Sequence, residues 1–344
     1  MKKFLALLLA LAMTLALAAC GDSGTTAPSG GEGGAGEGGD GKTYQIAMVC
    51  DSSISDGGWG AACYNAMVAA ADELGWKNDV ADSIAQSDYV NQITSFCDLG
   101  YDMIFLPGNQ YTDATKQVAA DYPDVCFALL NGTRADATDN IMSILPNADQ
   151  IGWMAGALAG LMTDSGVLGF MGAMEIDTTK AKLAGYEAAA KAVNPNVTQV
   201  LSAYTGDFSD TAKGVELAKG MIAQGADVFY GDASAVDSGA RQAIDEANAA
   251  SGNIDIYNIG QPADLLGQNP CVISSVVTDN AGMLKLAMQA CMDGTYGNDL
   301  IEGNLENGCL TVGQFNTDLV PQEIQDQYLE YVEQMKNGTF AVAQ

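Results

Sequence analysis

Short apolar runs alternate with longer amphipathic or alanine-rich stretches along most of the chain. The run Ile46–Cys50 predicts a buried strand, a polar loop follows over 51–60, and alanines from Ala61 onward predict a helix. The later predicted strands are Met103–Leu106, Val125–Leu130, Ile141–Leu145, Val167–Met171, Val197–Ala203, Val228–Tyr230, Ile254–Ile259 and Val272–Val277. The later predicted helices are Tyr89–Leu99, Thr112–Ala120, Ile151–Met162, Thr178–Ala192, Thr211–Gln224, Asp237–Ala250, Ala281–Met292 and Pro321–Met335.

This alternation predicts an α/β fold, because strands separated by helices form parallel sheets that are covered on both faces. The 344-residue chain is too long for one ordinary core, and a second strand and helix series starts at Ile151. We therefore expect two doubly wound parallel-sheet lobes with a hinge and an interlobe cleft. The expected N-terminal lobe comprises 43–145 plus 278–300, and the C-terminal lobe comprises 146–277 plus 301–344.

The first 42 residues differ in composition from the rest. Lys2 and Lys3, a Leu/Ala-rich run and small residues before Cys20 predict a signal peptide over 1–19. The stretch Leu17–Cys20 resembles a bacterial lipobox, which implies cleavage before Cys20 and lipidation of that residue; the alternative is an ordinary signal with a chance cysteine. Residues 20–42 are rich in Gly, Ser, Thr and acids, and predict a lipid-anchored flexible linker.

The net charge and the residue types present exclude several classes of function. The formal net charge of −29 argues against binding nucleic acid or an anionic lipid surface, and otherwise serves solubility. The chain contains no histidine, which excludes histidine-based catalysis and histidine-ligated zinc. The cysteines after Cys20 are odd in number, with no CxxC pair, so no zinc site or disulfide framework is predicted, although one disulfide stays open. They are Cys50, Cys63, Cys97, Cys126, Cys271, Cys291 and Cys309.

Polar side chains and one aromatic ring follow the predicted strands. Solutes bind beyond the carboxyl ends of the strands in such sheets, and a ring beside free backbone N–H groups suits a flat polar molecule. Trp59 could instead pack on its neighbours as part of a connecting loop. The candidate polar contacts at strand ends are Asp51, Asn109, Asn131, Asp210, Asp232, Ser234, Asp264 and Thr278.

Four ordered stretches resemble the basic membrane protein family of solute-binding lipoproteins, which includes nucleoside receptors of ABC transporters. They span nearly the whole body and occur in the family's order. They are Asp56–Gly60, Asp149–Gly160 with Gly166–Gly172, Tyr204–Gly214 with Gln224–Val228, and Ser274–Val277. The resemblance implies a fold like that of type I periplasmic binding proteins.

The resemblance also implies a base stacked between two aromatics, one per lobe, and these positions match Trp59 and Phe208. A core-packing role for Phe208 is the alternative. The polar set departs from the nucleoside receptors: Gly60 stands where the family has Asn, and Asn131 where it has a carboxylate. Pro262 replaces a ribose-binding acid, with Asp264 as a stand-in, and Thr278 replaces a lysine. "Flat heteroaromatic solute" is therefore a firmer expectation than "nucleoside".

The leading hypothesis is a lipid-anchored extracytoplasmic solute-binding protein of an ABC importer, a monomer that passes a nucleoside-like solute to permease subunits. Its only link to the membrane would be the lipid anchor. No catalytic residue, metal or cofactor is expected. The alternatives are a ligand sensor or surface interaction protein on the same fold, and a nucleoside-processing enzyme, which would need clustered carboxylates that the sequence does not show.

Overall fold

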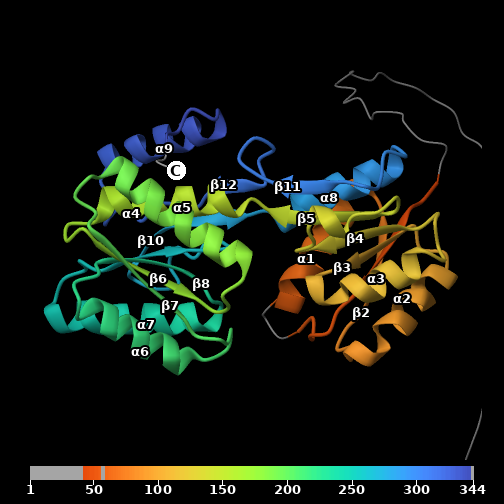
Figure 1. The fold of residues 1–344 in the computed structure, drawn as a ribbon, viewed down its shortest axis with the longest axis horizontal. Helices are drawn as coiled ribbons and strands as arrows, with labels where there is room; N and C mark the ends of the chain where they lie inside the picture. The colour runs from red at the N-terminus through yellow and green to blue at the C-terminus, as the bar shows by residue number, and fades with distance from the viewer. Residues whose placement is uncertain (1–41, 56–58, 342–344) are drawn as a thin grey trace, which may run out of the picture. The chain divides into compact units, whose positions relative to one another are not determined.

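The computed structural model describes residues 42–55 and 59–341 (Figure 1). Residues 43–344 form a compact unit of their own, separate from the preceding segment. The predicted signal peptide over 1–19, the predicted lipidation site Cys20 and all of the predicted linker except Lys42 lie outside the described residues.

The first sheet has six parallel strands in the order β11-β5-β4-β3-β1-β2. Its strands are β1 (Gln45–Val49), β2 (Lys77–Ala81), β3 (Met103–Leu106), β4 (Cys126–Leu130), β5 (Ile141–Pro146) and β11 (Leu300–Gly303). Because every strand runs the same way, their carboxyl ends meet at one edge. Two of them, β2 and β11, were not predicted: both are edge strands, and β2 (KNDVA) has no fully buried position.

Helices cover both faces of this sheet (Figure 1). Ile46 and Met48 of β1 pack against α1 (Trp59–Leu74) and α8 (Asn280–Met292). Ala47 and Val49 point to the opposite face, as the period of two in a strand requires. That face is covered by α2 (Tyr89–Asp98) and α3 (Thr112–Ala119).

The second sheet also has six strands, in the order β12-β10-β9-β8-β6-β7, with only β12 antiparallel. Its strands are β6 (Val167–Gly172), β7 (Gln199–Tyr204), β8 (Val228–Asp232), β9 (Tyr257–Gly260), β10 (Val272–Thr278) and β12 (Leu310–Val312). One face packs against α4 (Ala148–Met162), α5 (Asp177–Val193) and α9 (Gln322–Lys336). The other face packs against α6 (Thr211–Ile222) and α7 (Ala235–Ser251). The predicted α/β fold of two parallel-sheet lobes is confirmed.

The glycines of α4 allow this helix to lie directly on α5. A Cβ atom at Gly152 would come within 2.4 Å of the Lys182 carbonyl oxygen, and one at Gly156 within 2.2 Å of the Tyr186 carbonyl oxygen. Real Cβ atoms do not approach backbone this closely, so both positions require glycine. The Gly/Ala-rich pattern of this helix therefore reflects close helix packing.

Three connections carry the chain between the sheets, after β5, after β10 and after β11. They are hydrogen-bonded to one another. The Asn147 N–H donates to the Gly303 carbonyl at 2.8 Å, and the Asp279 N–H donates to the Cys309 carbonyl at 2.8 Å. Short, adjacent connections of this kind form the hinge regions of two-lobed proteins.

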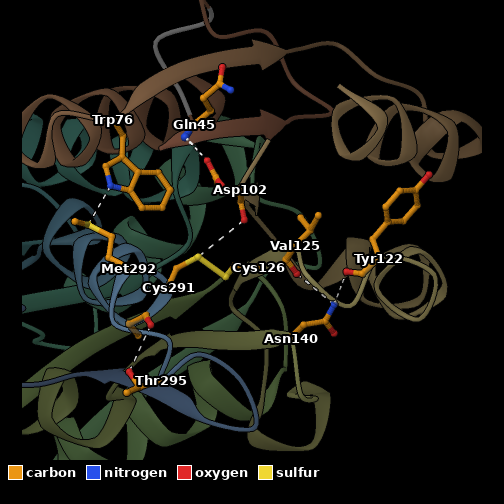
Figure 2. Close-up of a disulfide and its surroundings, with 11 residues drawn as sticks. Gln45, Trp76, Asp102, Tyr122, Val125, Cys126, Asn140, Cys291, Met292 and Thr295 are labelled. Atoms are coloured by element: carbon orange, nitrogen blue, oxygen red, sulfur yellow. Dashed lines mark hydrogen bonds between the residues drawn. A yellow bond between two sulfur atoms is a disulfide. The ribbon is translucent and has the colours of Figure 1, made fainter. Parts of the chain in front are cut away.

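A disulfide fastens the returning helix α8 to the first sheet (Figure 2). It joins Cys126, the first residue of β4, to Cys291 near the end of α8, with 6.4 Å between the Cα atoms. Close by, the Trp76 indole Nε1 donates to the Met292 Sδ at 3.3 Å. The sequence left one disulfide open without choosing this pair. The other described cysteines are free and buried, namely Cys50, Cys63, Cys97, Cys271 and Cys309.

Candidate ligand-binding site

Asp51 follows β1 and connects three segments at the carboxyl edge of the first sheet. Its Oδ2 accepts hydrogen bonds from the Tyr89 hydroxyl at 3.2 Å and from the Gln110 Nε2 at 3.0 Å. Burial and the nearby Asp51 charge raise the pKa of Tyr89, so the phenol keeps its proton and donates. The sequence predicted Asp51 as a polar contact but gave no sign of its two partners.

Trp59 is the first described residue of α1, and its ring is held at the same edge. The indole Nε1 donates to the carbonyl of Pro107, just after β3, at 2.7 Å, and 39% of the residue remains exposed. A ring that is fixed by a hydrogen bond and still half open to solvent can present a face to a solute. Trp59 is therefore not buried in the core, and its role toward a solute stays a prediction.

Gly60 lies next to Trp59 and packs against the preceding loop rather than facing solvent. It is buried, and a Cβ atom there would lie 2.6 Å from the Ser52 Oγ and 2.8 Å from the Ser53 carbonyl oxygen. No side chain at this position could reach a solute without moving the loop. A larger side chain at this position would therefore collide with the loop over 52–53.

We expect Gly60→Ala to destabilise the protein by about 1–3 kcal/mol, because the added methyl group collides with backbone. Gly220→Ala in α6 is the matched control, since nothing lies within 4 Å of its Cβ position. That control should gain about 0.5–1 kcal/mol from helix propensity. Urea unfolding of both variants measures the two effects, and equal stability of the two would contradict the crowding at Gly60.

Asn109 and Asn131 offer free amides at the ends of β3 and β4. Both residues are exposed, and within the described ranges neither side chain has a hydrogen-bond partner. Asn131 adopts a φ of 61°, which asparagine tolerates better than most residues, and its N–H donates to the Ile144 carbonyl at 2.7 Å. These two amides remain available to a solute.

Phe208 projects from the loop that follows β7 in the second sheet. Its side chain is 47% exposed, so it does not pack in the core. The loop is ordered by Asp207, whose Oδ1 accepts from the Ser209 N–H and Oγ, both at 2.6 Å. The Phe208 carbonyl accepts from the Ala235 N–H at 3.0 Å, which ties the loop to the start of α7.

Two apolar residues that the sequence analysis missed lie on the neighbouring loop. Met174 is 39% exposed and Ile176 is 47% exposed. The Gly206 N–H donates to the Ala173 carbonyl at 2.7 Å, so this loop runs beside the one that carries Phe208. Exposed apolar side chains beside an exposed ring would extend the surface on which a flat solute rests.

Asp210 and Asp264 are occupied within the protein. Asp210 caps α6 by accepting from the Lys213 N–H at 2.9 Å. Asp264 accepts a hydrogen bond from the Gln314 N–H at 2.9 Å. Burial raises the pKa of Asp264, but this and other hydrogen bonds outweigh burial, so its pKa lies below the ordinary value. Nearby, the Thr278 N–H donates to the Pro262 carbonyl at 2.8 Å. These groups shape the edge of the sheet.

Asp232 and Ser234 lie at the end of β8, where the second sheet gathers a polar cluster. The Asp232 Oδ1 pairs with the Lys182 Nζ at 2.7 Å, and its Oδ2 accepts from the Thr179 Oγ1 at 2.6 Å. Burial raises the pKa of Asp232, but the Lys182 charge and these hydrogen bonds outweigh burial and hold it below its ordinary value. Ser234 precedes α7 with a φ of 53°, a left-handed conformation that is rare for serine.

Asp237 lies in the first turn of α7, close to this cluster, and is partly buried. Its Oδ2 accepts from the Ala233 N–H at 2.8 Å, whereas its Oδ1 has no partner among the described residues. Burial raises the pKa of Asp237 to about 7. A proton on this carboxyl therefore favours the folded state.

We expect Asp237→Asn to remove a pH dependence of stability. The folded-state pKa of about 7 lies above the unfolded value, so this stability is present at low pH and is lost as pH rises toward 7. The wild type should lose on the order of 2–4 kcal/mol between pH 4 and pH 8 through this group. Thermal unfolding across that range tests it, with exposed Asp113→Asn as the control that should follow the wild type.

The comparison with known families decides the class of protein. The sequence profile of the Bmp family, described as "ABC transporter substrate-binding protein PnrA-like", matches residues 43–343. The chain belongs to this family. The resemblance predicted from the four sequence stretches is confirmed.

Relatives of this Bmp-family chain carry informative names. It is 28% identical over 246 residues to the "ABC transporter nucleoside-binding protein BmpA" of Lactococcus lactis, covering 68% of this chain and 70% of that protein. It is also 28% identical over 245 residues to the "CD4+ T-cell-stimulating antigen" of Listeria innocua. That match covers 68% of this chain and 65% of the relative, just under two thirds of its length.

The fold of this Bmp-family protein also occurs among solved solute-binding proteins. A solute-binding protein of an ABC transporter system from Conexibacter woesei aligns with a TM-score of 0.72 at 21% identity, covering 88% of this chain and 99% of the other. At this identity the likeness concerns the fold. It agrees with the expected resemblance to type I periplasmic binding proteins.

Members of the Bmp family are solute-binding proteins of ABC transporters rather than enzymes. Within the described ranges, no three Cys, Asp or Glu residues come together in a way that could hold a metal ion. In the same part of the chain, no helix has both the length and the apolar character needed to cross a membrane.

Proposed function

We propose that this Bmp-family protein is a lipid-anchored extracytoplasmic receptor of an ABC importer that binds a nucleoside or a related heteroaromatic between its two lobes. One observation carries the proposal. Each sheet presents a half-exposed aromatic ring at its carboxyl edge, Trp59 from the first and Phe208 from the second. The Trp59 ring is held by a hydrogen bond from its indole Nε1, and the backbone of Phe208 is held by a hydrogen bond to its carbonyl.

Two such rings suit a nucleobase because every base has a π-face. Stacking on an aromatic side chain contributes about 1–3 kcal/mol per contact. The free amides of Asn109 and Asn131 and the carboxylate of Asp51 would read the polar edges of the solute. The L. lactis relative is named as a nucleoside-binding protein, which supports this class of solute.

The remaining parts of the proposal come from the chain's first residues and from the family. Lipidation of Cys20 would hold the protein at the outer face of the membrane, and the linker over 20–42 would let the body reach its permease. In this role the protein acts as a monomer with no cofactor. Its partners are the solute and the permease subunits.

The experiment is a thermal-shift panel on residues 43–344 with purine and pyrimidine nucleosides, free bases, and sugars and amino acids as controls. The protein is first denatured and refolded to release co-purified solute, which is identified by mass. A ligand at 100 times its dissociation constant adds about 2.7 kcal/mol, or a few degrees of Tm. We expect nucleosides to give the largest shifts. A shift with another class of solute would keep the receptor role and reject the nucleoside, and no shift with any compound would favour a sensor or surface interaction protein on this fold.

A further inference from the structure

An ion pair lies among the groups at the carboxyl edge of the second sheet. Lys182 reaches from α5 to Asp232 at the end of β8, with 2.7 Å between the Nζ and Oδ1 atoms. The side chains are 15% and 21% exposed, so the pair is largely withdrawn from water but still open to the edge. Thr179 and Gln261 donate further hydrogen bonds to the Asp232 carboxylate.

Such a pair is poorly explained by stability. Withdrawing two charges from water costs about as much as their attraction returns, and apolar side chains of similar size often serve a fold equally well. Charged groups at the ligand-binding edge of an α/β sheet are candidates for recognition. The pair therefore calls for a role toward the solute.

Lys182 has one hydrogen-bond donor left. An ammonium group has three N–H donors and no acceptor. The Nζ donates to the Asp232 Oδ1 at 2.7 Å and to the Gln261 Oε1 at 3.3 Å. Among the described residues it has no third acceptor, so Asp232 and Gln261 orient the ammonium group and leave its remaining N–H for a group outside the protein.

The cluster lies close to the ring of the second sheet. In the sheet register, Gly172 of β6 pairs with Asp232 on one side and with Tyr204 on the other. Two strand spacings, about 10 Å, therefore separate Asp232 from the strand end that leads to Phe208. The loop then folds back, because the Phe208 carbonyl binds the Ala235 N–H, three residues after Asp232.

We propose that Lys182 donates a hydrogen bond to a carbonyl oxygen on the ring edge of the solute, so that the site selects oxo-heteroaromatics, such as 6-oxopurine nucleosides, over their amino counterparts. This inference rests on the proposed function. The physical reason is that the ammonium group only donates. A ring carbonyl accepts a hydrogen bond from its third N–H, whereas an exocyclic amino group presents further N–H donors and leaves that N–H without an acceptor.

Inosine and adenosine make a sharp pair of probes, because they differ in the substituent at C6 and the adjacent ring proton. Calorimetric titration of residues 43–344, freed of co-purified solute, should show inosine binding at least about 10-fold more tightly than adenosine. Lys182→Met keeps the apolar stem and removes the donor. It should weaken inosine binding about 10-fold or more and leave adenosine binding within about threefold of the wild type.

Lys180→Met is the matched control, because Lys180 lies on the same helix and pairs with the fully exposed Asp177. It should change neither affinity. The double variant Lys182→Met with Asp232→Asn removes the carboxylate left unpaired by the first change, so it separates loss of recognition from loss of folding. It should fold and show the same loss of preference for inosine.

The outcomes separate this inference from the proposed function. Equal binding of both nucleosides by the wild type, or an unchanged inosine preference in the double variant, overturns the role of Lys182 and leaves the receptor proposal standing. Binding of neither nucleoside by the wild type also overturns the role of Lys182, whereas the receptor proposal is then decided by the wider panel of solutes.

Discussion

Replacing Trp59 or Phe208 with alanine is expected to weaken nucleoside binding roughly 10-fold or more, and the double variant should lose nearly all measurable affinity. Each ring contributes about 1–3 kcal/mol of stacking to a bound base. Both residues are 39–47% exposed, so their removal should lower the free energy of unfolding by only about 1 kcal/mol. Calorimetric titration and thermal unfolding measure the two quantities independently.

Two controls sharpen this prediction. Trp59→Phe keeps a ring but loses the Nε1 hydrogen bond to Pro107, so an intermediate affinity would show that the tether contributes to stacking. Leu329→Ala removes an apolar side chain of similar exposure, 46%, on α9, and should change neither affinity nor stability by much. If both alanine variants bind as the wild type does, or if both unfold, the aromatic clamp is wrong.

The second large effect concerns the disulfide. Loss of the Cys126–Cys291 bond in a double alanine variant should lower the free energy of unfolding by about 3–5 kcal/mol. The cross-link spans 165 residues, and closing a long loop restricts the unfolded chain strongly. Urea unfolding of the first lobe, followed by the emission of Trp76 beside the bond, measures the loss.

The same variant provides the control for reduction. A reductant should destabilise the wild type and leave the double alanine variant unchanged, because the remaining described cysteines are free. Burial raises the pKa of Cys97 to about 12, so that thiol resists ionisation and exchange. A wild type whose urea midpoint does not move on reduction would mean that the bond adds nothing to stability.

Apolar patterning was sufficient to predict the elements with buried strands or continuous helical faces. The helix expected over Pro321–Met335 occupies Gln322–Lys336, and the one expected over Thr178–Ala192 occupies Asp177–Val193. The edge strands β2 and β11 were not predicted, because a strand with one open side needs no continuous apolar run. Their pairing depends on neighbours that are distant in sequence.

The candidate site was predictable only in part, for the same reason. Trp59 and Phe208 stood out because large rings in polar loops are unusual, and both prove exposed. The role proposed for Lys182 could not be predicted, since it depends on a carboxylate 50 residues away in sequence. The pairing of Cys126 with Cys291 likewise depends on α8 returning from the second sheet to the first, and no local pattern carries that information.

The central claim is that a solute stacks on Trp59, and fluorescence tests it most directly. The chain has three tryptophans, so Trp76→Phe with Trp153→Phe leaves Trp59 as the single reporter. We predict that a nucleoside changes the Trp59 emission saturably, with the dissociation constant found by calorimetry, and that Phe208→Ala shifts that constant upward. A nucleoside that binds by calorimetry while the Trp59 emission stays constant would contradict the account.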